Sequence, residues 1–325
     1  MKRRIAIIAG GDSSEIVVSL KSAEGIYSFL DKDKYNVYIA IVKRNEWYVS
    51  LPGGEKATIN KNDFSFSEEG EVKHFDFAYI TIHGTPGEDG LLQGYFELIR
   101  MPYSSCNALV SALTFNKFIC NHYLGSFGIR VADSVRLFKE ETLTNQELTA
   151  HLGLPVFVKP NDGGSSFGVT KVKEAEELQP AIEKAFTEGE EVIIERFITG
   201  TEITCGCYKI KGKEVIFPLT EVVSQNEFFD FDAKYNGQSE EITPARISAE
   251  LTEKVQRTTS KIYSLLGAKG IIRVDYIIPS DGEPTLLEVN TTPGMTDTSF
   301  IPQQVHAAGL TMKDVMTDII ENELI

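Results

Sequence analysis

The chain has 325 residues and a mass of 36.1 kDa, which predicts two or three structural units of ordinary size. Hydrophobic residues make up 42% and charged residues 24% of the chain, a composition that excludes a disordered or fibrous protein. Lys and Arg number 32 against 47 Asp and Glu. The net charge of −15 repels phosphate backbones, which argues against a general nucleic-acid binder.

Cysteine usage and the lack of long apolar runs indicate a cytoplasmic chain. Its four cysteines, at 106, 120, 205 and 207, contain no C-x-x-C pair, so neither a disulfide framework nor a thiolate zinc site is indicated. The apolar run 5–9 is too short for a signal peptide, and no run reaches the roughly 18–20 apolar residues of a membrane span. We expect no membrane partner, and a chain that begins directly with its fold.

The first hundred residues alternate between strand and helix patterns. Residues 4–9 predict a buried strand, and a helix follows, with Ser13 or Ser14 as its candidate N-cap. Its expected apolar face is Val17, Leu20, Ile26 and Leu30. Two more strands are expected at 35–42 and 75–82. This order of elements predicts an open α/β domain with a parallel sheet and functional loops at the carboxyl ends of its strands.

Beyond residue 106, helices and strands alternate without an internal repeat. The expected helices are 107–127, 174–187 and 250–266. Gly267 closes the last of them, and Pro180 predicts a kink or a late start in the second. The expected strands are 154–159, 169–172, 192–195, 202–210, 214–219, 271–278 and 284–290. The acidic and aromatic stretch 224–244 has no period and predicts a loop.

Charged and amide side chains alternate in the two expected strands nearest the C-terminus. Side chains two apart in a strand share a face, so Arg273 lies beside Asp275, and Glu288 beside Asn290. If the strands pair as a hairpin across 279–284, oxygen ligands converge without sulfur or imidazole, which suits Mg²⁺. The alternative is a charged outer face of an edge strand, salt-bridged by Arg273. Spacing alone leaves both open.

A glycine-rich segment, 159–168, follows an expected strand. Gly163, Gly164 and Gly168 let backbone N–H groups approach an anion, and Lys159 adds positive charge, which together predict a phosphate-binding lid. The segment lacks the Walker A pattern, and a plain hairpin turn is the alternative interpretation.

Two loops after N-terminal strands carry further candidate residues. His83, beside several glycines, can donate a hydrogen bond to a substrate carboxylate or phosphate, although a lone histidine is more often structural. Glu15 stands in the first turn of a helix, where a carboxylate either interacts with the helix dipole or binds an ammonium group. The glycine spacing is not G-x-G-x-x-G, so no dinucleotide fingerprint is present.

Six motifs, taken in chain order, match one family. They are G-G-x-S-x-E…V-S-L at 10–20, H-G-x-x-G-E-D-G at 83–90, K-P-x-x-x-G-S-S-x-G at 159–168, A-K-Y at 233–235, R-x-D at 273–275 and L-L-E-x-N-T-x-P-G-M at 286–295. Together they resemble the D-alanine–D-alanine ligase family of the ATP-grasp superfamily, from about residue 4 to 320. The resemblance implies an α/β fold: an N-terminal open parallel α/β (preATP-grasp) substrate domain, then a two-part ATP-grasp fold of α+β character. The implied domains are 1–103, 104–196 with the phosphate lid, and 197–325 with the metal and nucleotide site.

The resemblance also implies an activity. ATP would activate the carboxylate of one D-alanine as an acyl phosphate, and the amine of a second D-alanine would attack it, giving D-alanyl-D-alanine for peptidoglycan synthesis. ATP with two Mg²⁺ ions, for which Mn²⁺ can substitute, and a cytoplasmic homodimer are expected. Tyr235 in A-K-Y favours the dipeptide over D-alanyl-D-lactate or D-alanyl-D-serine. A non-catalytic ATP-grasp binding protein is the remaining alternative.

By the same resemblance, each site has matching residues. The two metal ions would be held by Asp275, Glu288 and Asn290, with Glu288 bridging. The triphosphate would contact Lys117, Lys159, Ser165, Ser166 and Lys234. The adenine and ribose would contact Glu195, Arg196, Phe197, Ile198 and Glu202. The substrates and the tetrahedral oxyanion would contact Glu15, His83, Ser165, Tyr235, Arg273, Gly294 and Ser299.

Within this last group the implied roles differ. Glu15 would hold the ammonium of the first D-alanine, close to His83 and linked through Ser165 to Tyr235. Arg273 and the Gly294 N–H would stabilise the oxyanion, and Ser299 with the Gly294 loop would receive the second carboxylate. Departures from the family pattern weaken the expected contacts of the lid, the adenine and the residue after Glu15; they are Ile16, Asn116, 161–163 and Arg196.

Overall fold

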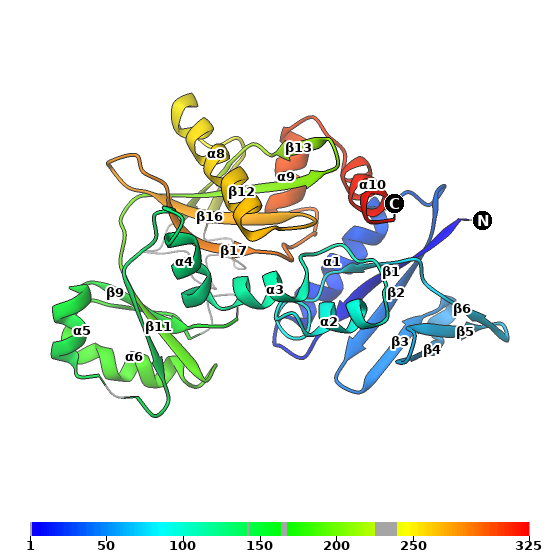
Figure 1. Ribbon diagram of the computed structural model, residues 1–325, viewed down its shortest axis with the longest axis horizontal. Coiled ribbons are helices and arrows are strands. Elements are labelled where there is room, and N and C mark those ends of the chain that lie inside the picture. The colour runs from blue at the N-terminus through cyan, green and yellow to red at the C-terminus, as the bar shows by residue number, and fades with distance from the viewer. Residues whose placement is uncertain (1, 142, 164–167, 225–238, 325) are drawn as a thin grey trace.

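The structure is a computed structural model that describes residues 2–141, 143–163, 168–224 and 239–324. Within these ranges, three sheets follow one another along the chain, with seven, four and six strands. In Figure 1 the first sheet lies at one end of the molecule and the second at the other, and the third lies between and above them. One mixed sheet and two antiparallel sheets, together with the helices that pack against them, confirm the expected α/β class.

The first sheet is parallel only at one end, where β1 pairs with β2 on one side and with the edge strand β7 on the other. These strands confirm the predictions for 4–9, 35–42 and 75–82. Four short antiparallel strands extend the sheet beyond β2, and the sequence did not predict them because three to five residues show too little alternation. The strands are β1 (Arg3–Gly10), β2 (Tyr35–Lys43), β3 (Glu46–Ser50), β4 (Lys56–Asn60), β5 (Ser65–Glu68), β6 (Glu71–Lys73) and β7 (Phe77–Ile80); the 3₁₀ turn η1 (Pro52–Gly54) joins β3 to β4.

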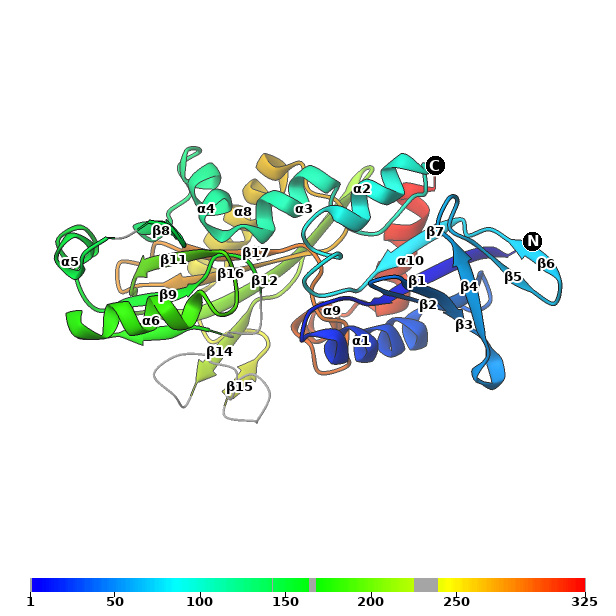
Figure 2. The same ribbon diagram turned by 90° about the horizontal axis from the view of Figure 1, so that it is seen from below.

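Helices α1 (Ile16–Phe29) and α2 (Leu91–Leu98) cover opposite faces of this sheet (Figure 2). Successive side chains of β1 alternate between the two faces, so Ile7 packs in the core under α1 and Ile8 in the core under α2. Both faces of β1 are therefore buried, which is why its sequence reads as a continuous apolar run.

The predicted N-cap of α1 is wrong, and its predicted apolar face is only half right: Ile26 and Leu30 are buried as expected, but Val17 and Leu20 are not. Glu15, and not Ser13 or Ser14, occupies the N-cap position, without a side-chain capping bond. Val17 is 57% exposed and Leu20 is 40% exposed. The buried face of α1 instead carries Ser19, Ser22, Ala23 and Ile26.

Close packing explains this face of small residues. The Ser19 hydroxyl accepts a hydrogen bond from the Gly10 N–H (3.0 Å), and the Ser22 hydroxyl accepts one from the Met295 N–H (3.3 Å). A Cβ at Gly25 would lie 2.3 Å from the Met295 carbonyl oxygen. α1 therefore lies against both β1 and a loop from the C-terminal part of the chain, and hydrophobic periodicity cannot report such a face.

A Gly25→Ala variant is expected to lose about 1–3 kcal/mol of stability, because its methyl group has no space beside the Met295 backbone. Denaturant unfolding measures this loss. Gly94→Ala in α2 is the matched control, since the nearest atom to a Cβ there, the Ala108 Cβ, is 3.9 Å away. Alanine is the better helix former, so the control should be as stable as the wild type or more so. Equal stability of both variants would contradict the close approach.

The expected helix 107–127 is two helices, α3 (Ala108–Phe115) and α4 (Lys117–Gly125), because Asn116 has extended backbone angles and caps α4. The Asn116 side chain accepts a hydrogen bond from the Ile119 N–H (3.0 Å). Because Asn116 is both the C-cap of α3 and the N-cap of α4, only one residue separates the two helices, and the sequence pattern reads as one helix.

The second sheet is antiparallel, in the order β10-β9-β11-β8. Pro180 is the third residue of α6, which confirms the predicted late start. This region contains β8 (Ser134–Phe138), α5 (Asn145–Leu152), β9 (Val156–Pro160), β10 (Thr170–Val172), the 3₁₀ turn η2 (Ala175–Glu177), α6 (Leu178–Ala185) and β11 (Glu191–Arg196).

The third sheet is built around β12, which pairs with β14 on one side and β16 on the other. The strands predicted at 202–210, 214–219, 271–278 and 284–290 are confirmed, as is the long helix closed by Gly267. The stretch 224–244, expected as a loop, contains the short strand β15, which pairs with β14, so the loop prediction is wrong there; residues 225–238 lie outside the described residues. The elements are β12 (Thr201–Ile210), β13 (Lys213–Ile216), β14 (Thr220–Ser224), β15 (Ser239–Ile242), α8 (Ala249–Leu266), β16 (Ile272–Ile278), β17 (Thr285–Asn290), α9 (Phe300–Ala307) and α10 (Met312–Glu323).

The three sheets fall within 1–103, 104–196 and 197–325, and we propose these ranges as domains. Helices α3 and α4 pack against each other and against β17, α3 also packs against α2, and buried residues of α3 and α4 belong to the core of the third sheet. They therefore connect the first domain to the strand that carries Glu288. No helix within the described ranges is both long and apolar enough to cross a bilayer.

Candidate active site

The β16–β17 hairpin brings the charged C-terminal residues together. Arg273 lies opposite Asn290, and Asp275 lies opposite Glu288, which confirms the predicted hairpin and shared face. The side chains of Arg273, Asp275 and Glu288 are only 14%, 13% and 33% exposed. A solvated outer face of an edge strand does not fit such burial. The hairpin instead presents these groups to the interior of the molecule.

Arg273 and Asp275 form a two-pronged ion pair. The Arg273 Nε donates to Asp275 Oδ1 (2.9 Å), and a terminal guanidinium nitrogen donates to Oδ2 (2.8 Å). Burial by itself lowers the pKa of Arg273, but the carboxylates of Asp275, Glu288 and Glu88 raise it above its usual value. The Phe300 ring centroid lies 5.3 Å from the guanidinium carbon. Arg273 is therefore a fixed and permanently positive group.

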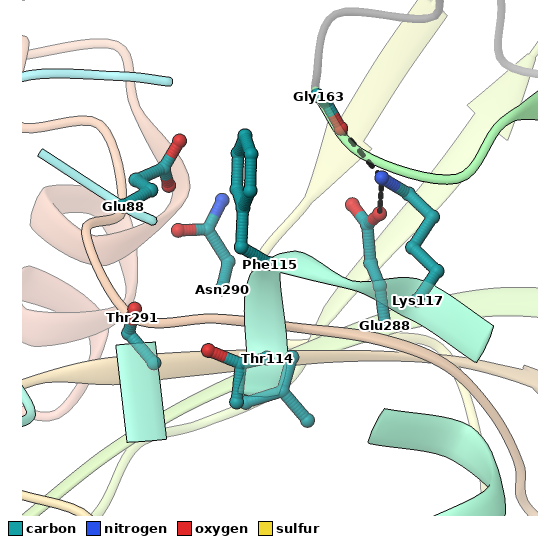
Figure 3. Close-up of a pocket in the computed structure, with 9 residues that line it drawn as sticks. Glu88, Thr114, Phe115, Lys117, Gly163, Glu288, Asn290 and Thr291 are labelled. Atoms are coloured by element: carbon teal, nitrogen blue, oxygen red, sulfur yellow. Dashed lines mark hydrogen bonds and ion pairs between the residues drawn. The ribbon is translucent and has the colours of Figure 1, made fainter. Parts of the chain in front are cut away.

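A pocket opens beside the hairpin. Lys117, the first residue of α4, reaches into it. Figure 3 shows its Nζ between the Gly163 carbonyl oxygen, to which it donates, and the Glu288 carboxylate at 3.9 Å. The pocket is lined by Glu88, Thr114, Phe115, Lys117, Gly163, Glu288, Val289, Asn290 and Thr291. Residues from all three proposed domains thus meet around one space.

Glu88 was not among the residues singled out from the sequence, although it lies within the H-G-x-x-G-E-D-G motif. Its carboxylate accepts a hydrogen bond from the Gly84 N–H (2.7 Å). Burial raises the pKa of Glu88 to about 8, and the charges of Glu15 and Glu288 add to the rise. The motif marked this loop, but burial, which only the fold provides, distinguishes Glu88 within it.

His83 and Glu15 lie on adjacent loops at the carboxyl ends of β7 and β1. The Ser13 hydroxyl donates to the His83 carbonyl oxygen (2.9 Å), and a Cβ at Gly84 would lie 3.7 Å from a Glu15 carboxylate oxygen. His83 is 7% exposed, and its Nε2 has no hydrogen-bond partner among the described residues. A buried unpaired ring nitrogen is typical of a group that a ligand completes.

Acid should destabilise the fold through His83. Burial, and then the charge of Arg273, lower the pKa of His83 from 6.5 to about 4. Below pH 6.5 the unfolded imidazole takes up a proton that the folded one does not, so stability is lost as pH falls from 6.5 to 4. His83→Gln should remove on the order of 3 kcal/mol of that loss, at about 1.4 kcal/mol per pKa unit.

Urea unfolding of the wild type and the His83→Gln variant between pH 7 and pH 4 measures the difference. His74→Gln is the control, because the His74 side chain is 62% exposed. If His83→Gln and the wild type lost stability in parallel, the inference that the His83 imidazole is buried and neutral in the folded protein would be wrong.

The loop after β17 presents Gly294 beside Ser299, the N-cap residue of α9. The Ser299 hydroxyl accepts a hydrogen bond from the Thr296 N–H (3.1 Å). A Cβ at Gly294 would lie 3.0 Å from that hydroxyl, so a larger residue there would crowd Ser299. The two predicted substrate residues are thus neighbours on one turn.

Most described residues predicted for the nucleotide lie on β9, β11 and β12 or, for Phe197 and Ile198, between β11 and β12. Lys159 forms an ion pair with Glu195 (2.6 Å), and the Phe197 ring lies under the Lys171 ammonium, 3.9 Å from its centroid. Arg196 follows Glu195 and points to the other strand face, where it contacts Asp133 (3.2 Å). Its side chain is therefore turned away from the Lys159 face. Ile198 and Glu202 are both half-buried.

A polar network of two asparagines joins the start of the lid to α4. Asn161 is fully buried; its Oδ1 accepts from the Phe118 N–H (2.9 Å), and its Nδ2 donates to the Glu191 carboxylate (2.7 Å). Asn116 donates to the same carboxylate (3.3 Å). The two asparagines thus fix the first turn of α4, and with it Lys117, to the second sheet.

Comparison with known proteins gives the family. The D-Ala–D-Ala ligase N-terminal model matches residues 4–106, and the corresponding C-terminal model matches 123–321. The D-alanine–D-alanine ligase of Parabacteroides distasonis is 76% identical over 324 residues, covering 100% of this chain and 98% of that protein. The chain belongs to the D-alanine–D-alanine ligase family.

Solved structures of the family superpose on nearly the whole chain. A VanG D-Ala:D-Ser ligase from Enterococcus faecalis has a TM-score of 0.88 at 33% identity, covering 99% of this chain and 100% of that one. A Bacillus anthracis D-alanine–D-alanine ligase in complex with ATP has a TM-score of 0.79 at 35% identity, covering 99% and 97%. The two-part ATP-grasp fold expected from the sequence is therefore confirmed.

Some family positions cannot be placed. Ser165 and Ser166 of the lid, and Lys234 and Tyr235 of the A-K-Y motif, lie outside the described residues. The strands on either side of the lid, β9 and β10, pair antiparallel with each other.

The hairpin fits the divalent ions that the family implies. It offers two carboxylates and one amide oxygen, a donor set that suits Mg²⁺. The Asn290 Oδ1 is oriented by the Thr292 N–H (3.1 Å), and the Asp275 carboxylate by Arg273. No three His, Cys, Asp or Glu side chains gather as a metal site in the described part of the chain, but this set does not require a third carboxylate.

Proposed function

We propose that this chain is an ATP-dependent D-alanine–D-alanine ligase that forms D-alanyl-D-alanine through an acyl phosphate, releasing ADP and phosphate, for peptidoglycan precursor synthesis. The observation that carries the proposal is the pairing of Arg273 with Asn290 and Asp275 with Glu288 beside Lys117. Oxygen ligands and fixed cations at one pocket are what transfer of a phosphoryl group to a carboxylate requires. Full-length relatives in the same ligase family support the substrate.

In the first step, a carboxylate oxygen of one D-alanine attacks the γ-phosphorus of ATP, and ADP leaves with the electrons of the broken P–O bond. We assign Lys117 and Lys159 to the inner phosphates. Lys117 lines the pocket, and Lys159 lies on β9, where it pairs with Glu195. Asp275, Glu288 and Asn290 would hold Mg²⁺ or Mn²⁺, which neutralises phosphate charge when bound. The backbone of Ser165 and Ser166 and the Lys234 side chain are assigned to the γ-phosphate.

In the second step, the amine of the other D-alanine attacks the acyl carbon. The resulting tetrahedral oxyanion lies near the fixed positive charge of Arg273 and the Gly294 N–H. The carbon–oxygen bond to phosphate then breaks, phosphate leaves with the electron pair, and the amine nitrogen loses a proton. Arg273 suits this role because its fork is already oriented by Asp275.

We assign the first D-alanine to Glu15 and His83, and the second carboxylate to Ser299 and Gly294. Glu15 can hold an ammonium, and a neutral His83 with an unpaired Nε2 can take part in a hydrogen bond with the substrate. Ser165 and Tyr235 are proposed to link to Glu15. For the adenine and ribose we keep Glu195, Phe197, Ile198, Glu202 and the backbone of Arg196, whose side chain faces away.

Two alternatives within the ligase superfamily differ in the acceptor. The VanG structure belongs to a D-Ala:D-Ser ligase, but at 33% identity it is more distant than the 76% identical D-alanine–D-alanine ligase. The dipeptide is therefore favoured over D-alanyl-D-serine and D-alanyl-D-lactate. A non-catalytic ATP-grasp protein has no need of the opposed charges at 273, 275 and 288.

Mass spectrometry of the products formed from ATP, Mg²⁺ and D-alanine tests the function. D-alanyl-D-alanine and stoichiometric phosphate are expected, with no stimulation by L-alanine. Parallel reactions with D-serine and D-lactate across pH 6–9 test the acceptor, because an amine and a hydroxyl respond differently to pH. Predominant depsipeptide at neutral pH would replace the dipeptide assignment, and ATP binding without D-alanine-dependent phosphate release would leave only the non-catalytic alternative.

A homodimer is the assembly that we propose. Leu91 and Leu98 on α2 and Leu109 on α3 are 66%, 85% and 74% exposed, and the two helices are adjacent, since the Ala108 N–H donates to Glu97 (3.0 Å). Such an exposed apolar group fits burial against a second copy. Sedimentation velocity measures the assembly.

We also propose the reducing cytoplasm as the compartment, because the four cysteines are free and buried and the reaction uses ATP.

A further inference from the structure

Gln303, on the second turn of α9, joins two segments that flank Arg273. Its Nε2 donates to the Glu241 carboxylate (2.6 Å) and to the Thr298 carbonyl oxygen (2.8 Å). Glu241 belongs to β15, whereas Thr298 belongs to the loop that carries Gly294 and Ser299. One amide group thus ties the edge of the third sheet to the turn before α9.

Glu241 faces the same side of the sheet as Arg273. Burial raises the pKa of Glu241, while the hydrogen bond from Gln303 and then the charge of Arg273 lower it. The carboxylate is therefore close enough to Arg273 to feel its charge, and it is sheltered from solvent. A sheltered charged acceptor makes the Gln303 hydrogen bond stronger than one on the surface.

The turn that Gln303 holds is the one that positions Ser299. Within this turn, Ser299 donates its N–H to the Thr296 carbonyl oxygen (2.9 Å) and accepts from the Thr296 N–H (3.1 Å). These bonds close the turn on itself but do not fix it to the sheet. Ser22 on α1 fixes its beginning through the Met295 N–H, and Gln303 fixes its end through Thr298.

Gln304, the next residue along α9, makes different contacts from Gln303. Gln304 is fully buried, accepts from the Gly206 N–H (2.9 Å), and donates to the Thr204 carbonyl oxygen (3.1 Å). It therefore joins α9 to β12 and serves the core of the fold. Gln303 points the other way, toward the substrate side of α9, and is half-buried.

We propose that Gln303, anchored by Glu241, is a positioning residue for the acceptor amino acid: it sets the place of Ser299 and so the affinity for the second carboxylate. The inference rests on the proposed function. It assigns no contact between Gln303 and the substrate. Gln303 acts through the Thr298–Ser299 turn, and activation of the first D-alanine does not depend on it.

Hydroxylamine provides the discriminating acceptor. Its nitrogen attacks the acyl phosphate, a C–N bond forms, phosphate leaves with the electron pair of the broken C–O bond, and the nitrogen loses a proton, giving D-alanine hydroxamate. Because hydroxylamine has no carboxylate, its reaction does not use the Ser299 site. Dipeptide formation and hydroxamate formation in the same enzyme therefore separate acceptor binding from activation.

In Gln303→Met, which keeps side-chain length but removes both hydrogen bonds, KM for the acceptor D-alanine is expected to rise about tenfold. KM for ATP and the rate of hydroxamate formation should stay within about twofold of the wild type. Gln179→Met is the matched control, since Gln179 also bridges two oxygens, of Leu143 and Asn145 (both 3.1 Å), far from the pocket. This control should leave both reactions unchanged.

Glu241 variants test the anchor. Glu241→Gln keeps an oxygen that accepts from Gln303 and should hold the acceptor KM within about threefold, whereas Glu241→Leu should reproduce the tenfold rise. Combining Glu241→Leu with Gln303→Met should add little to either single effect, because both remove the same link.

Three outcomes would overturn the proposal or its basis. An unchanged acceptor KM in Gln303→Met would show that the link does not position Ser299. An equal loss of dipeptide and hydroxamate in that variant would show a merely structural role. A wild-type enzyme that forms neither product would instead overturn the proposed function, and the two failures are thus distinguishable.

Discussion

Glu288→Gln is expected to reduce D-alanyl-D-alanine formation by at least about 10³-fold while leaving the fold intact. Glu288 lies opposite Asp275 and 3.9 Å from the Lys117 ammonium, so its charge faces both the proposed cations and the phosphate site. A neutral amide keeps the shape of the side chain but cannot balance two divalent ions. The loss should therefore appear in the chemical step.

Phosphate release and dipeptide formation measure the effect, and thermal unfolding checks the fold. Glu283→Gln is the matched control, because Glu283 lies in the turn of the same hairpin and pairs with Lys254 (2.5 Å) at the surface. An exposed pair contributes little to stability, so this control should retain full activity. Activity of Glu288→Gln within tenfold of the wild type would remove Glu288 from the metal site.

A second readout makes the test independent of turnover. Mn²⁺ binding, followed by the paramagnetic relaxation of water protons in the presence of ADP, should weaken in Glu288→Gln and stay unchanged in Glu283→Gln. Intact Mn²⁺ binding combined with lost activity would assign Glu288 to the chemistry and not to the ions.

The hairpin could be predicted because its evidence is local. Side chains two apart in a strand must share a face, so Arg273 and Asp275, or Glu288 and Asn290, needed only the correct strand assignment to be placed together. The long helix α8 was equally accessible, since it has an amphipathic pattern, an N-cap at Ser248 and Gly267 at its end. Its features also depend on nearby residues alone.

Other features depend on contacts that the sequence does not encode locally. The buried face of α1 lies against the backbone of Gly10 and Met295, where there is no space for larger side chains. The apolar residues Val17 and Leu20 are therefore on the exposed side, and the apolar periodicity predicted the wrong positions for them. The raised pKa of Glu88 arises from burial under three converging segments. Gln303 could not be predicted from the sequence, because a single glutamine forms no recognisable motif and Glu241 is brought beside it only by the fold.

Family resemblance supplied the roles that spacing left open. For the β16–β17 hairpin, the register confirms that Asp275 lies opposite Glu288, and the low exposure of Arg273 and Asp275 argues against a solvated outer face, whereas the metal-binding role stays a proposal. For Arg196, the alternation along β11 turns the side chain toward Asp133, so a residue-by-residue transfer of the adenine contact applies only to its backbone. The alternation of side chains along a strand can thus show which of the roles assigned by a motif a given side chain is able to fill.

Arg273→Ala is expected to lower kcat by about 10²–10³-fold with a smaller change in KM, because the charge that it removes is needed most when the oxyanion forms. The loss of its partner also leaves the Asp275 carboxylate, 13% exposed, without its two-pronged hydrogen bond. A stability decrease of about 3–5 kcal/mol should therefore accompany the kinetic effect.

Arg273→Lys separates the two consequences. It keeps a positive charge beside Asp275, which should restore most of the stability, but it lacks the planar fork and should recover only part of kcat. Arg130→Ala is the control for loss of an arginine–aspartate pair, since Arg130 and Asp281 are 46% and 52% exposed. Stopped-flow or steady-state kinetics at saturating ATP, with unfolding measured on the same samples, gives both quantities. A pure KM effect in Arg273→Ala would place this arginine in substrate binding, because stabilisation of the oxyanion must appear in kcat.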